Sequence, residues 1–361
     1  MPDETLPRSI YEAETQEEDL WFLPGDPVDS DPTAIPLPRL DTVRVPGAAI
    51  WQAAENAQVR GLAQAAAETA RLDEAVKAWA SVPGGDGISH RLALLDVAGL
   101  SWAEGQRLPV ERLALYGVLR LSASDADHRD LALADWARER LLGSRDPFAP
   151  EAFLGRVRVE EDGLGEIDAI GGMGRRPVGE EFRALSQRWL DMVQRADLHP
   201  ITRAAFAYHL WRGLGLSGFE GVIEPSIIAA KMASTDQVHL PFLPLALSGV
   251  QGLMASGVPP RKLELWYDGI ANAARVARLE LDRLAAWHRR ATDSIADLSG
   301  KTPRALIAAL IATPVLSAQS AEAHTGASRA AVQRNLALFT ERGLVREITG
   351  QERYRIWGVV V

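Results

Sequence analysis

The sequence predicts a mainly α-helical protein, with a helical core that carries a short flap hairpin and with a winged helix-turn-helix at the C-terminus. Two observations predict this fold class. Apolar residues recur at spacings of three and four through most of the chain, which is the periodicity of amphipathic helices. The C-terminal part adds two short extended runs to three helical ones, in the order typical of a winged helix-turn-helix.

Composition limits the classes of protein that the chain can belong to. Of its 361 residues 47% are hydrophobic and 24% charged, so a large core with one or two attached modules is expected. The chain has no cysteine, which excludes disulfides and thiolate metal sites. Its start lacks a basic stretch followed by an apolar run, so we expect a cytoplasmic protein. No apolar run is long enough to cross a membrane.

The net charge of −9 is spread unevenly along the chain. Residues 1–45 hold eleven acidic and three basic side chains, whereas residues 301–361 hold eight basic and four acidic ones. A DNA-binding module needs only a local positive face to displace the counterions of phosphates. The acidic total therefore does not exclude nucleic acid as a partner of the C-terminal part.

Residues 1–45 form an acidic tail with seven prolines, which we expect to be disordered. Such a composition cannot bury enough apolar surface to offset the entropy of the chain. An apolar island at residues 20–23, LWFL, interrupts the tail. We expect this island to dock on the folded part, with binding of a partner as the alternative.

Residues 46–300 form the predicted helical core. Helical periodicity and breaks at glycine and proline predict its helices at about residues 46–79, 90–98, 109–121, 125–141, 180–197, 199–211, after Pro225, and 259–298. Residues 154–175 mix β-branched residues with glycine and charge, as a short flap hairpin would. The apolar stripe of the long helix at 259–298 is expected to pack on the core, with a dimer seam as the alternative.

Residues 301–361 are predicted to form the winged helix-turn-helix. A first helix at 303–312 stops at Pro314, and Ser317 is a suitable N-cap for a short second helix. Gly326 supplies the tight turn, after which Ser328 caps a third helix at 329–342. Two extended runs, 344–349 and 353–359, then form the hairpin wing.

The exposed face of the third helix and the wing hold the candidate DNA-binding residues. Gln333 and Arg334 would read base edges by bidentate hydrogen bonds, whereas the arginines of the wing would contact phosphates. The full set of candidates is Ser328, Arg329, Gln333, Arg334, Arg346, Arg353 and Arg355. The expected partner is double-stranded DNA, and the alternative is that the module docks on protein or forms a dimer.

Two segments resemble Fic proteins. Residues 344–350, LVREITG, and 353–357, RYRIW, look like the C-terminal winged helix of many Fic-type proteins. Residues 198–211, LHPITRAAFAYHLW, are similar to the helix that leads into the Fic catalytic loop. The closer likeness is to a bacterial family of Fic-related helical proteins of unknown function that end in a helix-turn-helix. It covers residues 65–361 and implies a Fic-like helical core, with residues 154–175 as the flap hairpin.

The catalytic motif of the Fic family is missing. The family has His-Pro-Phe, an acidic residue and Gly-Asn-Gly-Arg, where this chain has GLGLSGFEGVIE at residues 213–224. A general base and a phosphate clamp are therefore both absent, so we expect neither nucleotidyl transfer nor a cofactor. A metal site at residues 125–130 is not expected either. Asp125 begins a helix, where an acidic residue complements the helix dipole, and the spacing of the acidic residues and His128 in this segment matches no known ligand set.

We therefore interpret the chain as a DNA-binding protein that regulates transcription, with a catalytically degenerate core. Dimerisation is expected for such a regulator. Two alternatives stay open: a Fic-like nucleotidyl transferase with a displaced active site, and an antitoxin-like module that only binds protein. Binding of ATP would distinguish the transferase from both the transcriptional regulator and the antitoxin-like module.

Overall fold

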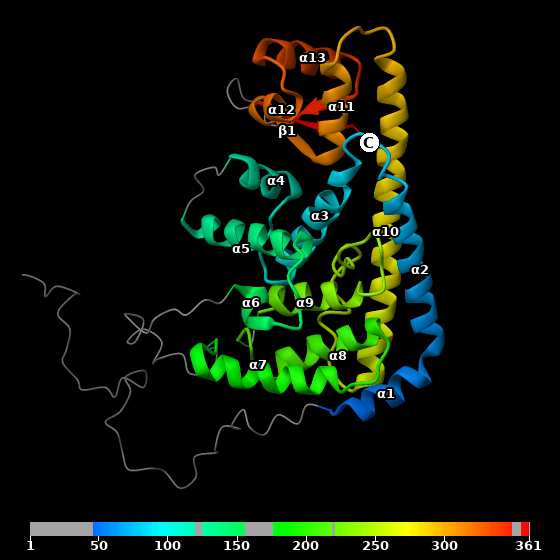
Figure 1. The fold of residues 1–361 in the computed structure, drawn as a ribbon, viewed down its shortest axis with the longest axis vertical. Helices are drawn as coiled ribbons and strands as arrows, with labels where there is room; N and C mark the ends of the chain where they lie inside the picture. The colour runs from blue at the N-terminus through cyan, green and yellow to red at the C-terminus, as the bar shows by residue number, and fades with distance from the viewer. Residues whose placement is uncertain (1–45, 120–124, 156–175, 219–220, 349–354, 361) are drawn as a thin grey trace, which may run out of the picture. The chain divides into compact units, whose positions relative to one another are not determined.

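The computed structural model describes residues 46–119, 125–155, 176–218, 221–348 and 355–360. The predicted tail, nearly all of the flap hairpin and Arg353 lie outside these residues. Residues Arg44–Val361 belong to one compact unit. Its mainly helical character confirms the predicted fold class (Figure 1). Within the described residues, no helix is long and apolar enough to span a membrane.

The elements follow one another in the predicted order. The helices are α1 (Ala48–Ala57), α2 (Val59–Lys77), η2 (Gly85–Gly87), α3 (Ile88–Ala103), α4 (Val110–Leu119), α5 (Asp125–Leu142), α6 (Pro150–Leu154), α7 (Gly179–Gln194), α8 (Pro200–Gly213), α9 (Ile223–Ala233), α10 (Pro259–Ser294), α11 (Thr302–Ala312), α12 (Ala318–Thr325) and α13 (Arg329–Glu341). The strands are β1 (Val315–Ser317), β2 (Val345–Glu347) and β3 (Ile356–Val359). The short α6 and β1 were not predicted.

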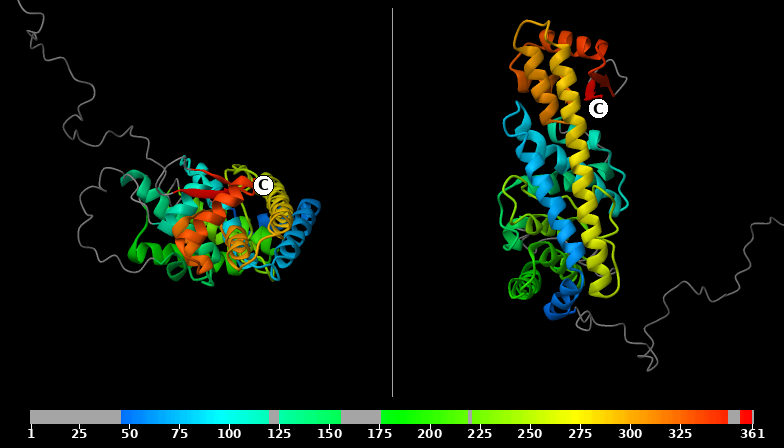
Figure 2. Two further views of the ribbon diagram at one scale, coloured as in Figure 1. Left: turned by 90° about the horizontal axis from the view of Figure 1, so that it is seen from above. Right: turned by 90° about the vertical axis from the view of Figure 1, so that its right-hand side faces the viewer.

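The long helix α10 organises the unit. It packs beside α2 and then continues to the C-terminal module, as the right-hand view of Figure 2 shows. Proline at the first helical positions starts it, because proline lacks the N–H that a helix cannot satisfy there. Its predicted apolar stripe is buried against the core, including Leu263, Trp266, Ile270 and Leu281. The stripe therefore packs on the parent domain, as expected.

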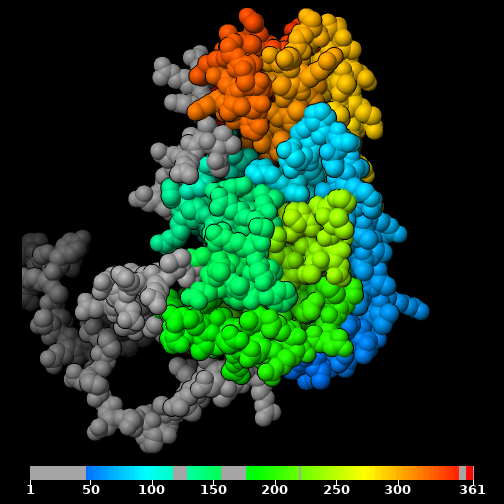
Figure 3. Space-filling model, in the orientation of Figure 1, coloured from blue at the N-terminus to red at the C-terminus, as the bar shows by residue number. Residues whose placement is uncertain are grey.

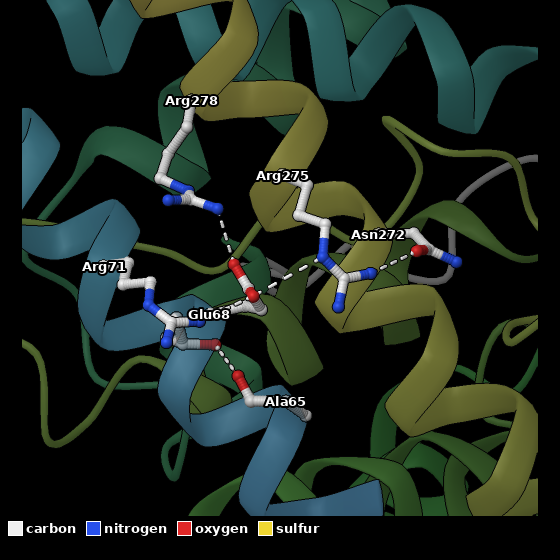
Figure 4. Close-up of polar contacts among 7 residues, drawn as sticks. Ala65, Glu68, Arg71, Asn272, Arg275 and Arg278 are labelled. Atoms are coloured by element: carbon white, nitrogen blue, oxygen red, sulfur yellow. Dashed lines mark hydrogen bonds and ion pairs between the residues drawn. The ribbon is translucent and has the colours of Figure 1, made fainter.

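One buried carboxylate joins α2 to α10. The side chain of Glu68 is 9% exposed, and three arginines surround it (Figure 4). Arg71 and Arg278 bind its two oxygens at 2.7 and 2.6 Å, and Arg275 lies 3.5 Å away. Since a charge out of water is costly unless it is paired, these contacts satisfy Glu68 and fix the two helices in register.

Two more carboxylates hold the irregular segment between α9 and α10. Oδ1 of Asp73 accepts the backbone N–H groups of His239 and Leu240 at 2.8 and 2.7 Å. Oδ1 of Asp96 accepts those of Leu245 and Ala246 at 2.9 and 2.7 Å. These bonds replace the pairing that a helix or sheet would give to a buried backbone.

Asp96 should make the stability of the protein depend on pH. Burial raises the pKa of its carboxyl group from 3.8 to about 7, although backbone N–H groups act against this. Between these two values the folded protein holds a proton that the unfolded chain releases, so stability should fall as pH rises from about 4 to about 7. Asp96→Asn keeps an acceptor oxygen and cannot titrate. Urea unfolding at several pH values measures this effect. The free energy of unfolding of the wild type should decline over this pH range, and that of Asp96→Asn should decline less. An equal dependence on pH in the two proteins would contradict the raised pKa of Asp96.

Candidate nucleic-acid interface

Local caps define the helices of the C-terminal module. Ser317 and Ser320 form a capping box, with N–O distances of 3.0 and 2.9 Å between each backbone N–H and the other hydroxyl. Gly326 ends α12 with φ of 63°, a left-handed conformation that glycine adopts without strain. The hydroxyl of Ser328 accepts the N–H of Ala331 at the start of α13. The predicted caps and turn are all present.

A three-stranded antiparallel sheet completes the module, in the order β1-β3-β2. Strands β2 and β3 form the predicted wing, in which Val345 pairs with Val359. Strand β1 pairs with β3 on the other side, in a register that joins Leu316 to Trp357. This strand has only three residues, and its partner lies some forty positions later, so no local periodicity could have indicated it.

Helix α13 is anchored by one face and exposes the other. Val332, Leu336 and Phe339 are fully buried in the core. The opposite face is exposed and carries four of the candidate residues, namely Ser328, Arg329, Gln333 and Arg334. In Figures 1 and 2, α13 lies at the end of the unit farthest from α7 and α8, with α11 and α12 between it and α3. The exposed face of α13 can therefore approach a major groove without obstruction by the core.

The two arginines on this face, Arg329 and Arg334, differ in their contacts with acidic side chains. The guanidinium of Arg329 lies 3.8 Å from the carboxylate of Glu322 on α12. No ion pair of Arg334 occurs among the described residues. An exposed arginine without an acidic partner can donate two parallel hydrogen bonds to guanine. Arg334 is thus the candidate best placed to read a base.

The described part of the wing adds two arginines. Arg346 is exposed on β2. Arg355 precedes β3, and its side chain is 52% exposed with Nε 3.7 Å from the carboxylate of Glu347. Both lie on the hairpin that a winged helix uses to contact the DNA backbone.

Several polar contacts fix the module to the core. Arg91 on α3 donates to the carbonyl oxygens of Leu310 and Thr313 at 2.5 and 2.8 Å, which caps the C-terminal end of α11. The indole N–H of Trp287 on α10 donates to the carbonyl of Leu344 at 2.8 Å. On the face drawn in Figure 3, the atoms of the module lie directly against those of η2 and α3.

Side-chain hydrogen bonds hold the segment after α8, where the sequence resemblance expects a Fic catalytic loop. The carboxylate of Glu224, which is 8% exposed, accepts hydrogen bonds from Ser217 and Arg176. Ser217 in turn accepts the indole N–H of Trp211 at 2.8 Å. Residues 213–231 include no histidine that could act as a general base. Across the described residues there is also no group of three side chains suited to hold a metal ion.

Comparison with known proteins agrees with this description. Residues 304–360 match the model of a family described as an HTH DNA binding domain. This match confirms the predicted helix-turn-helix and supports a role in DNA binding. No curated protein matches the chain.

Among solved structures, the chain is similar to a Fic family protein from Desulfovibrio desulfuricans G20. The identity is 14% and the TM-score 0.39, over 82% of this chain and 96% of that one.

Proposed function

We propose that the protein is a sequence-specific DNA-binding protein that regulates transcription, with a core that lacks nucleotidyl-transfer activity. The observation that carries this proposal is the exposed polar face of α13, in a module that matches a DNA-binding domain. In this proposal Gln333 and Arg334 contact base edges, while Ser328, Arg329 and the arginines of the wing contact phosphates. A homodimer that binds two half-sites is part of the proposal.

Salt dependence of binding tests the proposal directly. The full-length protein should bind duplex DNA, and the logarithm of its affinity should fall linearly with that of salt concentration, by about 0.9 for each phosphate contacted. Three or four contacts would give a slope of about −3. A gel-shift titration on random and selected duplexes measures both slope and preference. Absence of binding to every duplex at low salt would favour protein docking instead.

The alternative of a transferase has its own test. We expect no tight ATP binding, because the loop at residues 213–224 lacks the arginines that would hold a triphosphate. It also lacks the histidine that would act as the general base of nucleotidyl transfer. Calorimetry with ATP and magnesium, together with transfer of labelled AMP to protein, should show no signal. Micromolar affinity or labelled protein would reverse this part of the proposal.

A further inference from the structure

A pocket of about 290 Å³ lies where the DNA-binding module meets the core. The core lines it with His90 and Leu94 of α3, Leu113 of α4 and Arg138 of α5. The module lines it from the other side with Thr313, which follows α11, and with His324 of α12. A molecule in this pocket would therefore touch both parts at once.

The polar groups that the core contributes to the pocket, Arg138 and His90, can donate hydrogen bonds. On the module side, Thr313 donates its hydroxyl to the carbonyl of Ala309, and Nδ1 of His324 lies 2.7 Å from the carbonyl oxygen of Ser320. Arg138 is oriented by Asp135, whose Oδ1 accepts from its Nε at 2.9 Å and from its Nη2 at 2.7 Å. Nη1 of Arg138 lies 3.3 Å from Nδ1 of His90. Since a guanidinium can only donate, Nδ1 of His90 is the acceptor, and the proton of this imidazole is on Nε2. Each terminal nitrogen of Arg138 has one further N–H, although Nη2 also lies 3.7 Å from the carboxylate of Glu139, and Nε2 of His90 is a donor.

The charge state of His90 agrees with this arrangement. Burial lowers the pKa of His90 to about 4, and the guanidinium groups of Arg138 and Arg91 add to the effect. His90 is therefore neutral near pH 7, and the positive charge of the pocket belongs to Arg138. Asp135 at 2.7 Å and Glu139 at 3.7 Å pair with this charge from outside the lining. None of the described residues that line the pocket is acidic.

The rest of the lining is apolar. Leu94 and Leu113 provide the larger surfaces, and Ala114 and Ala312 the smaller ones. Pockets for small ligands are mostly apolar, hold a few well-placed polar groups and start at about 300 Å³, so this one suits a small molecule. Donors at one place and methyl groups at another fit an anion with a ring or short apolar chain. Arginine recognises carboxylates in particular, because its planar fork matches their two oxygens.

We propose that this pocket binds a small organic carboxylate with an apolar body, and that the bound molecule changes the affinity of the protein for DNA. The effect on DNA affinity rests on the proposed function. The physical reason for the coupling is that a ligand which contacts both α3 and α12 alters the free energy of their packing. If that packing differs between the free and the DNA-bound protein, the two affinities are linked.

Benzoate is the probe for the site, with benzamide as its uncharged counterpart. Ligand-observed NMR on the full-length protein, titrated to about 10 mM, should give a dissociation constant of about 1 mM for benzoate. Affinity for benzamide should be about tenfold lower, because it is neutral and has one acceptor oxygen, so it cannot form the bidentate ion pair with Arg138 that a carboxylate forms. Arg138→Gln should remove this difference between the two probes.

Two variants in which leucine replaces an alanine locate the binding site. Ala114→Leu fills the pocket and should abolish benzoate binding, whereas Ala323→Leu adds the same leucine at an exposed position of α12 and should leave binding unchanged. Circular dichroism establishes that each variant folds. Failure of benzoate to bind at 10 mM, or its continued binding to folded Ala114→Leu, overturns the proposed site.

A gel shift with and without saturating benzoate tests the coupling. We expect the DNA affinity to change about fivefold or more in the wild type and to stay constant in Ala114→Leu. Benzoate binding with no change in DNA affinity overturns the regulatory half of the proposal. Benzoate binding by a protein that binds no duplex would support the site while removing the proposed function, so the two failures are distinguishable.

Discussion

Replacing Arg334 with alanine should weaken binding to the preferred duplex by about 1–3 kcal/mol, or roughly 5- to 150-fold. The reason is that Arg334 is exposed on the anchored helix α13, with no acidic partner among the described residues. Its guanidinium can then pair with one guanine. Loss of this pair should also relax the preference at one base position. Affinity measured on a set of duplexes that vary one position at a time gives both numbers.

Arg346→Ala is the matched control for Arg334→Ala, because it removes the same charge from the wing. It should weaken binding to all duplexes alike and reduce the salt slope by about one unit. Arg334→Ala should change the slope less. If Arg334→Ala weakens selected and scrambled duplexes equally, or if Arg346→Ala alone changes the preferred sequence, the roles given to α13 and the wing are wrong.

Much of this interface could be predicted because it depends on local chemistry. The caps at Ser317 and Ser328 and the turn at Gly326 are set by residues within a few positions of one another. The apolar spacing of α13 determines which face is buried, and therefore which side chains remain exposed. The same reasoning predicted most of the core helices and the buried stripe of α10.

Other features depend on contacts between distant residues and left no local signal. Strand β1 exists because β3 pairs with it. Glu68 reads as an ordinary exposed acid of an amphipathic helix, and only the approach of α10 brings Arg275 and Arg278 to it. The junction pocket joins residues as far apart as His90 and His324, whose proximity no spacing along the chain encodes.

Gly87→Ala should destabilise the junction between the core and the DNA-binding module by about 3 kcal/mol, the upper end of the usual cost of overpacking. Gly87 has φ of −80°, a value that alanine adopts without strain, so its backbone alone does not require glycine. A Cβ atom at this position would lie 2.3 Å from Cα of Ala312 and 2.6 Å from its carbonyl oxygen. Backbone atoms cannot yield as a flexible side chain can, so α11 would have to move away from η2. Urea unfolding should show the loss of stability.

Gly269→Ala is the control that separates this steric effect from the substitution itself. A Cβ at Gly269 in α10 would meet only Cα of Gly252, at 3.9 Å. In a helix interior alanine is favoured over glycine by about 0.5–1 kcal/mol, so Gly269→Ala should stabilise the protein. The two variants thus make the same chemical change, but with opposite expected effects on the free energy of unfolding. Because Gly87 also lines the junction pocket, folded Gly87→Ala should bind benzoate more weakly than Gly269→Ala does. Equal stability of the two variants would mean that η2 and α11 are not in close contact in solution.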